Sequence, residues 1–185
     1  MTRAELLAGL REHAYLEGDF VLRSGRRSRY YLDKYRFETR PELLEALGGA
    51  IAAAVSEHDP EAVRLAAPEL GAVALAAAAS LAGRLPFLIV RKEEKGYGTA
   101  NRLEGVFATG ERVCLVEDVV TSGGAALAAV EAVRAAGLEC RTAVCVVDRE
   151  EGGADALARR GVRLRALFRA REIAETSKSA ANPHG

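Results

Sequence analysis

Short apolar runs alternate with longer alanine-rich runs through most of the chain, and this alternation limits the fold more than any other feature. The short runs have the length and β-branched content of strands, whereas the longer runs repeat apolar residues at helical spacing. Strands are predicted at residues 62–68, 86–92, 112–118, 140–148 and 162–168, and helices at residues 69–83, 125–137 and 154–161. Strands that alternate with helices form a parallel sheet covered on both faces, so we expect an α/β fold.

The N-terminal part of the chain departs from this alternation. Residues 3–13 repeat apolar residues at helical spacing, and Thr2 stands where a cap is expected. Strand-like pieces with aromatic and β-branched residues flank the turn residues 24–28, which favours a hairpin. Residues 41–58 are typical of a helix, with Pro41 near its first position.

Length and charge limit the class of protein. The 185 residues suit one domain, which we place at residues 1–175, followed by a tail, 176–185, that is expected to be disordered. Lys and Arg number 26, as do Asp and Glu, so no overall field favours nucleic acid or an anionic membrane. Apolar runs are too short to span a bilayer, and the N-terminus lacks a basic-then-apolar signal pattern. A cytoplasmic protein without nucleic-acid or membrane partners is expected.

The cysteines and histidines do not indicate a metal site or a covalent nucleophile. Cys114 and Cys145 lie inside apolar strand patterns, and Cys140 forms no C-x-x-C pair with them. The three histidines are scattered along the chain. Buried reduced thiols and no protein-only metal site are therefore expected.

The stretch "VCLVEDVVTSGGA", residues 113–125, runs from a strand pattern through two acids into a small-residue turn that opens a helix. The amides of such a turn, together with the helix dipole, bind an anion such as phosphate. Carboxylates repel phosphate, so Glu117 and Asp118 indicate a ligand that also has hydroxyl donors. A sugar phosphate meets both demands. No lysine follows as in a nucleoside-triphosphate P-loop.

A solvated strand end before an ordinary turn would also give two acids and adjacent glycines. The continuous order of apolar residues, two acids, apolar residues and Thr121 resembles the signature of the type I phosphoribosyltransferases. Together with "LRSGRRSRYYLD", "RKEEKGYGTANRLEG" and "VVDREEGG", it is similar to orotate phosphoribosyltransferases over roughly residues 20–168. The resemblance implies a central parallel sheet flanked by helices, with a small N-terminal hood at about residues 1–40.

Residues 92–104 fit neither the helical nor the strand period and contain two glycines, which favours a mobile loop over the ligand. Two of the four lysines of the chain, Lys92 and Lys95, lie in it. A solvated charged surface would look the same. The resemblance implies that this loop binds diphosphate and reaches the active site of a partner subunit.

The resemblance also implies roles for single residues. Lys95 would neutralise the diphosphate in catalysis, while Glu117 and Asp118 hold the ribose hydroxyls and favour positive charge on the ring. Thr121 and Arg149 would contact orotate, whose carboxylate suits a guanidinium fork. The residues expected to bind substrate are Arg23, Tyr31, Arg91, Lys92, Lys95, Tyr97, Glu117, Asp118, Val119, Val120, Thr121, Ser122, Gly123, Gly124, Ala125 and Arg149.

This sequence departs from the family pattern at several positions. Arg23 stands for a usual lysine, and Leu70 stands where bacterial relatives often have one. Of the aromatic pair found in many relatives only Tyr31 remains, followed by Leu32. Gly96 replaces a common Asp, which favours a more flexible loop.

The implied reaction transfers the 5-phosphoribosyl group from phosphoribosyl diphosphate to orotate with inversion, giving orotidine 5'-phosphate and diphosphate in pyrimidine biosynthesis. Mg²⁺ is expected on the diphosphate of the substrate, and a homodimer with shared active sites is expected. Two alternatives stay open. One is a transferase for another base, against which Arg149 and the hairpin argue. The other is a regulator that senses phosphoribosyl diphosphate and binds nucleic acid, against which the neutral charge argues.

Overall fold

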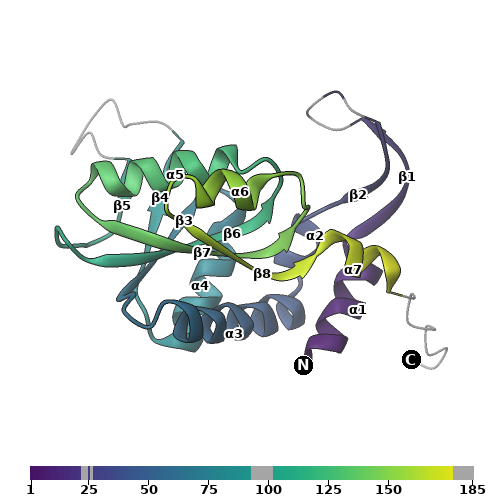
Figure 1. The fold of residues 1–185 in the computed structure, drawn as a ribbon. Helices are drawn as coiled ribbons and strands as arrows, with labels where there is room; N and C mark the ends of the chain where they lie inside the picture. Colours follow the sequence, from purple (N-terminus) through teal and green to yellow (C-terminus); the bar gives the residue numbers. More distant parts are fainter. Residues whose placement is uncertain (22–24, 26, 93–101, 177–185) are drawn as a thin grey trace.

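The computed structural model describes residues 1–21, 25, 27–92 and 102–176. Its centre is a six-stranded sheet in the order β5-β4-β3-β6-β7-β8 (Figure 1). The strands are β3 (Arg64–Pro68), β4 (Phe87–Val90), β5 (Leu103–Glu104), β6 (Arg112–Val120), β7 (Glu139–Asp148) and β8 (Arg163–Arg169). β5 pairs antiparallel to β4, and the other pairings are parallel. The expected α/β class is confirmed.

Helices cover both faces of the sheet because the central strands alternate their side chains between two apolar cores. One face carries α3 (Pro41–His58) and α4 (Gly71–Gly83), and the other carries α5 (Gly124–Ala135) and α6 (Gly153–Ala158) (Figure 1). In β6, Cys114 and Val116 belong to the core that includes α3 and α4. Val113 and Leu115 belong to the core that includes α5. Burial on both faces explains why β6 has a continuous apolar sequence.

A hairpin and short helices lie beside the sheet. α1 (Arg3–His13) begins with a capping box: Thr2 Oγ1 accepts from the amide of Glu5 at 3.2 Å, and the Glu5 carboxylate accepts from the amide of Thr2 at 2.7 Å. The remaining elements are β1 (Tyr15–Val21), β2 (Arg27–Leu32), α2 (Tyr35–Glu38) and α7 (Ala170–Glu175). β1 and β2 form the expected antiparallel hairpin, and α7 packs against α1.

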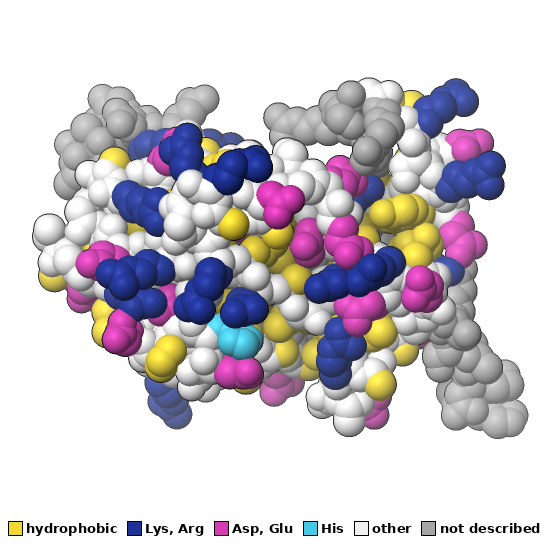
Figure 2. All heavy atoms as spheres, viewed as in Figure 1, with side chains coloured by type: hydrophobic (Ala, Val, Ile, Leu, Met, Phe, Trp, Pro, Cys, Tyr) yellow, Lys and Arg dark blue, Asp and Glu magenta, His cyan; other side chains and the backbone are white. Residues whose placement is uncertain are grey.

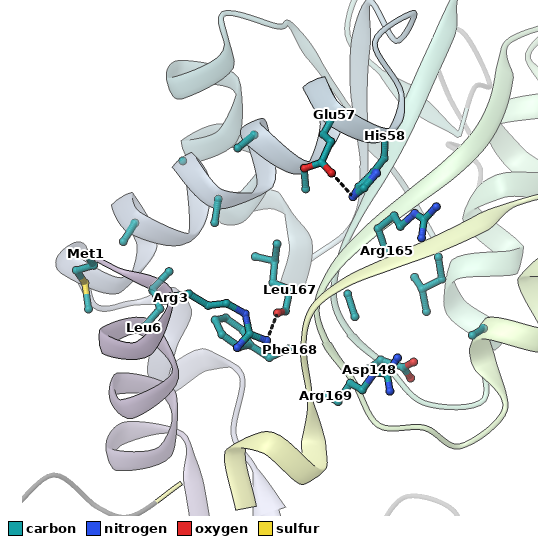
Figure 3. A pocket seen from close by; sticks show the side chains of 18 residues that line it. Met1, Arg3, Leu6, Glu57, His58, Asp148, Arg165, Leu167, Phe168 and Arg169 are labelled. Atoms are coloured by element: carbon teal, nitrogen blue, oxygen red, sulfur yellow. Dashed lines mark hydrogen bonds and ion pairs between the residues drawn. The ribbon is translucent and has the colours of Figure 1, made fainter. Parts of the chain in front are cut away.

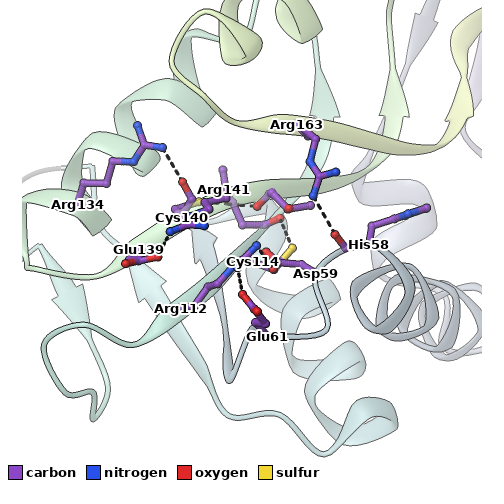
Figure 4. A network of polar contacts seen from close by, with 12 residues as sticks. His58, Asp59, Glu61, Arg112, Cys114, Arg134, Glu139, Cys140, Arg141 and Arg163 are labelled. Atoms are coloured by element: carbon purple, nitrogen blue, oxygen red, sulfur yellow. Dashed lines mark hydrogen bonds and ion pairs between the residues drawn. The ribbon is translucent and has the colours of Figure 1, made fainter.

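A polar network fixes the beginning of β6, at the end of the sheet opposite its carboxyl ends (Figure 4). Arg112 forms ion pairs with the fully buried Asp59, at 2.7 Å, and with Glu61. Arg134 donates to the carbonyl of Cys140 at 2.6 Å. The Arg112 ion pairs tie the residue after α3 to the start of β6, and the Arg134 hydrogen bond ties the end of α5 to the start of β7. The carboxyl ends of the strands stay available for a ligand.

The structure corrects the sequence prediction at several elements. The sheet is not wholly parallel, because β5 adds an antiparallel edge of two residues. β6 continues to Val120, beyond the expected end at residue 118, because Val119 and Val120 still pair with β7. The helix expected from residue 69 begins at Gly71, and α2 and α7 were not predicted. The expected burial of Cys114, Cys140 and Cys145 is confirmed.

The surface carries charges of both signs. On the face seen in Figure 2, Lys and Arg side chains lie among Asp and Glu side chains, as the equal totals in the sequence suggest. Within the part of the chain that the structure describes, no helix has both the length and the apolar character needed to cross a bilayer. The division into a domain at residues 1–175 and a tail remains a prediction, since 177–185 lie outside the described residues.

Candidate active site

Glu117 and Asp118 lie near the carboxyl end of β6, between β3 and β7. They are 5% and 4% exposed, so they are not the solvated strand end that the sequence left open. Burial raises the pKa of Glu117 to about 8, and the adjacent charge of Asp118 is the next cause. A buried acid pair at a strand end, in which the pKa of Glu117 is raised, indicates a functional site.

The loop after β6 opens α5. Gly123 has a φ of 83°, a conformation that glycine adopts without strain, and its carbonyl accepts from the amide of Leu127 at 2.9 Å. Thr121, Ser122, Gly124 and Ala125 are exposed around it. The first amides of a helix have no partner within the helix. The loop therefore offers accessible donors to an anion next to the acid pair.

Arg149 lies directly after β7, and its amide donates to the carbonyl of Val120 at 2.9 Å. Its guanidinium, 9% exposed, pairs with Glu151 at 3.1 Å and lies 5.2 Å from the ring centre of Tyr30. The Nε of Arg149 is buried and has no hydrogen-bond partner among the described residues. This unused donor suits a planar carboxylate.

Lys34, in the segment between β2 and α2, reaches the acid pair. Its Nζ lies 2.5 Å from Oδ2 of Asp118, whose Oδ1 accepts from the amide of Val119 at 2.5 Å. Burial opposes the charge of Lys34, but the hydrogen bond and charge of Asp118 outweigh it, so the pKa of Lys34 is raised.

Glu38, the last residue of α2, adds a third buried carboxyl to the site. It is 4% exposed, and its Oε1 has no hydrogen-bond partner in the described part of the chain. Burial, and then the charge of Asp118, raises the pKa of Glu38 to about 8. The site thus gathers three carboxyls and one ammonium.

Similarity to known proteins agrees with this geometry. The chain is 49% identical to the orotate phosphoribosyltransferase of Methanocella arvoryzae over 156 residues, which is 84% of this chain and 87% of that protein. The chain belongs to the orotate phosphoribosyltransferase family. No protein-family model matches it.

Two solved structures show the same fold. The orotate phosphoribosyltransferase of Aeropyrum pernix is 35% identical, with a TM-score of 0.81 over 94% of this chain and 97% of that one. The Mycobacterium tuberculosis enzyme, solved with 5-phospho-alpha-D-ribosyl 1-diphosphate, is 32% identical, with a TM-score of 0.79 over 93% and 98% of the two chains. The sheet and helices described above are therefore those of a type I phosphoribosyltransferase.

The structure brings together most of the site expected for an orotate phosphoribosyltransferase. The acid pair, the loop at 121–125 and Arg149 meet at the carboxyl ends of β6 and β7. Arg91 follows β4, where its Nη1 lies 3.4 Å from Oε1 of Glu104. The amide of Lys92 donates to Glu69 at 2.8 Å, at the end of β3. Arg23, Lys95 and Tyr97 lie outside the described residues.

The hairpin places two of its tyrosines in different surroundings. Tyr31, one of the residues expected to bind substrate, is 42% exposed, and its ring centre lies 5.7 Å from that of Phe20. Tyr30 instead faces Arg149, and it stacks on Tyr15 with ring centres 4.9 Å apart. Successive strand residues point to opposite faces, so the hairpin register decides which tyrosine meets Arg149.

Sequence reasoning missed three contributors to the site, namely Lys34, Glu38 and Tyr30. Lys34 gave a weak signal, as one of four lysines in an arginine-rich chain, whereas Glu38 gave none. No sequence pattern placed either of them beside residue 118.

One groove of the described structure lies away from the acid pair. A groove of about 870 Å³ runs between α1, α3 and β8 (Figure 3). Its described lining includes Leu6, His58 and Phe168 but neither member of the acid pair. This groove therefore does not mark the site that the buried carboxyls indicate.

Proposed function

We infer that the protein transfers the 5-phosphoribosyl group from phosphoribosyl diphosphate to orotate, giving orotidine 5'-phosphate and diphosphate in pyrimidine biosynthesis. Besides membership of the family, one observation supports this inference: the buried acid pair of β6 is followed closely in the chain by the exposed loop that opens α5. Of the two alternatives, the transferase for another base and the nucleic-acid-binding regulator, neither is needed to explain the site.

The loop at 121–125 is the proposed site of the 5-phosphate. The amides at the start of α5 donate to the phosphate oxygens, and the positive end of the helix dipole favours their charge. Gly123 keeps the backbone in the turn that this requires.

Glu117 and Asp118 are proposed to bind the ribose hydroxyls. As diphosphate leaves, the ribose gains positive charge, and the two carboxyls stabilise that charge at short range. A carboxylate also makes stronger hydrogen bonds to hydroxyls than a neutral acceptor does. Catalysis by this chain is then positioning and electrostatics, without a covalent intermediate.

Arg149 is proposed to bind the carboxylate of orotate, with Thr121 beside it. Glu151 and the ring of Tyr30 hold the guanidinium, whose Nε has no hydrogen-bond partner among the described residues. A fixed guanidinium binds a carboxylate more tightly than a mobile one, because less rotational freedom of the side chain is lost on binding.

Arg91, Lys92 and Lys95 are proposed to bind the diphosphate, together with Mg²⁺. Both oxygens of Asp118 already accept hydrogen bonds, so the acid pair does not form an open metal cage. A Mg²⁺ held by diphosphate oxygens and waters fits a site that offers few protein ligands. When bound, the ion would neutralise charge on the leaving group. We further propose a cytoplasmic homodimer with shared active sites.

An ultraviolet assay of orotate consumption, with phosphoribosyl diphosphate and Mg²⁺, tests the activity directly. Uracil and adenine serve as competing bases in parallel assays. Consumption of orotate with release of diphosphate is expected. Preference for uracil or adenine would overturn the proposed role of Arg149.

A further inference from the structure

Lys34 comes from the segment before α2, yet its ammonium lies against a carboxylate 84 positions later in the chain. Its Nζ is 2.5 Å from Oδ2 of Asp118, and the side chain of Lys34 is only 33% exposed. Oδ1 of Asp118 accepts from the amide of Val119. Two donors, one on each oxygen, fix the carboxyl plane of Asp118.

Gly71, the first residue of α4, leaves the space in which this pair forms. A Cβ at position 71 would lie 1.8 Å from Oδ2 of Asp118 and 2.4 Å from Nζ of Lys34. Such distances are below any possible van der Waals contact, so a larger residue would displace the pair. Three segments therefore meet at one ion pair: the residue before α2, the start of α4 and the end of β6.

We propose that Lys34 is a positioning residue of the transferase, which orients Asp118 and offsets the negative charge of the acidic cluster before the ribose binds. This role rests on the proposed function. Lys34 acts through Asp118 and does not itself contact the reacting atoms.

The charges around the site support this role. One ammonium faces three buried carboxyls, and the charge of Lys34 lowers the pKa of both Glu117 and Glu38 against the effect of burial. Four titratable groups from neighbouring elements face Glu117: Asp118 on β6, Lys34 before α2, Glu38 on α2 and the Cys145 thiol on β7. The charge of Asp33 also raises the pKa of Glu38. Without Lys34, Glu117 and Glu38 would hold their protons to higher pH.

Orientation matters because the ribose hydroxyls need acceptors at fixed positions. A carboxyl that rotates must be ordered again on each binding event, which weakens binding and slows the reaction. The carboxyl of Asp118 is already oriented before substrate binds, because Lys34 donates to Oδ2 and the amide of Val119 donates to Oδ1.

Lys34→Met tests the proposal, because it keeps a long apolar stem and removes the charge. We expect kcat/KM for phosphoribosyl diphosphate to fall about 10- to 100-fold, the loss typical of a hydrogen bond between charged groups. KM for orotate should change little. Arg36→Met is the matched control: Arg36 lies two residues further on and pairs with Asp33 at 3.6 Å, with a side chain 54% exposed. It should behave as wild type.

The pH profile separates positioning from a merely structural role. The pKa of Glu117 near 8 predicts that wild-type kcat/KM for phosphoribosyl diphosphate rises with pH through about 8. In Lys34→Met this rise should shift to higher pH. Gly71→Ala keeps the lysine but removes the space for the pair, and it should cause the same shift. An unshifted profile in both variants, with both folded by circular dichroism, would overturn the proposal.

A double-mutant cycle identifies the partner of Lys34. If Lys34 acts through Asp118, the double variant Lys34→Met/Asp118→Asn should be no slower than Asp118→Asn alone. The proposal would be overturned if the rate losses of the two single variants multiplied in the double variant. It would also be overturned if diphosphate inhibited Lys34→Met more weakly than wild type, because Lys34 would then bind the diphosphate. If the wild-type protein did not consume orotate, the proposed function itself would be contradicted. Failure of the proposed function is therefore distinguishable from failure of the proposed role of Lys34.

Discussion

Gly153 packs directly against Gly123, backbone to backbone, and this contact joins the start of α6 to the phosphate loop. A Cβ at Gly123 would lie 3.1 Å from both Cα and O of Gly153. A Cβ at Gly153 would lie 2.6 Å from the carbonyl oxygen of Thr121 and 3.1 Å from the amide nitrogen of Gly123. Neither residue has room for a side chain, so the segment after Arg149 supports the loop that is proposed to bind the 5-phosphate.

Gly153→Ala should therefore weaken phosphate binding. The added methyl group would push against the backbone of the loop, which cannot yield as a flexible side chain would. We expect KM for phosphoribosyl diphosphate to rise about tenfold and stability to fall by about 1–3 kcal/mol. Steady-state kinetics and urea unfolding provide the two measurements.

Gly49→Ala provides the control for that substitution. Gly49 lies in α3, where a Cβ would have no atom within 4 Å, so alanine should stabilise the helix by up to about 1 kcal/mol without changing KM. If Gly153→Ala left both KM and stability unchanged, the close contact between the two loops would have no functional role.

Arg149→Ala should affect orotate more than phosphoribosyl diphosphate. The guanidinium is held by Glu151 and Tyr30, and its loss removes a hydrogen bond to a charged group, about 1.5–3 kcal/mol. KM for orotate should rise about 10- to 100-fold. Arg141→Ala is the control, because Arg141 pairs with Glu139 near the beginning of β7 and is exposed. Equal increases in both KM values would contradict the assignment of Arg149 to the base.

Glu38→Gln should change how stability depends on pH. The pKa of Glu38 is about 8 in the folded protein, above its ordinary value of 4.5, because the carboxyl is buried beside Asp118. Such a group contributes stability that is fully present below about pH 4.5 and is lost as pH rises through 8. Glutamine stays neutral throughout. Between pH 5 and 8.5, Glu38→Gln should gain on the order of 1–3 kcal/mol relative to wild type, measured by urea unfolding. Parallel pH curves for the two proteins would show that Glu38 is ionised at neutral pH.

The sheet and its helices could be predicted because their signals are local. Each buried strand is a continuous apolar run, and α3 extends over residues 41–58 as its periodicity indicates. β5 was missed because two residues carry no period, and its place depends on pairing with Ile89 and Val90. The same holds for α2, a single turn that follows no apolar repeat.

The sequence signals of the acid pair and of the loop at 121–125 were also local, because the two are adjacent within one motif. Lys34 could not be placed, because its contact with Asp118 depends on how the segment between β2 and α2 lies beside β6 and on the space left by Gly71. Glu38 had the sequence context of a surface charge, yet it is 4% exposed. Burial of a polar residue results from tertiary packing, which a sequence pattern does not contain.

The last prediction concerns the homodimer with shared active sites. Lys95 lies in a polar glycine-containing segment, and the resemblance assigns this segment to the site of the partner subunit. Asp118 lies in the core of its own subunit, at the end of β6. The two residues of one working site would then come from different chains.

Lys95→Ala and Asp118→Asn should each be nearly inactive alone and should recover activity when mixed. In a mixed dimer one site holds both changes and the other holds neither. Random exchange of equal amounts makes half of the dimers mixed, so about a quarter of wild-type activity should return under closed two-fold symmetry. Mixing Lys95→Ala with a second inactive variant of the same residue, such as Lys95→Gln, is the control and should restore nothing. Subunit exchange is followed independently by native mass spectrometry of differently tagged chains. Confirmed exchange without recovered activity would place Lys95 in the site of its own subunit, because only then does every site of every dimer carry a defect.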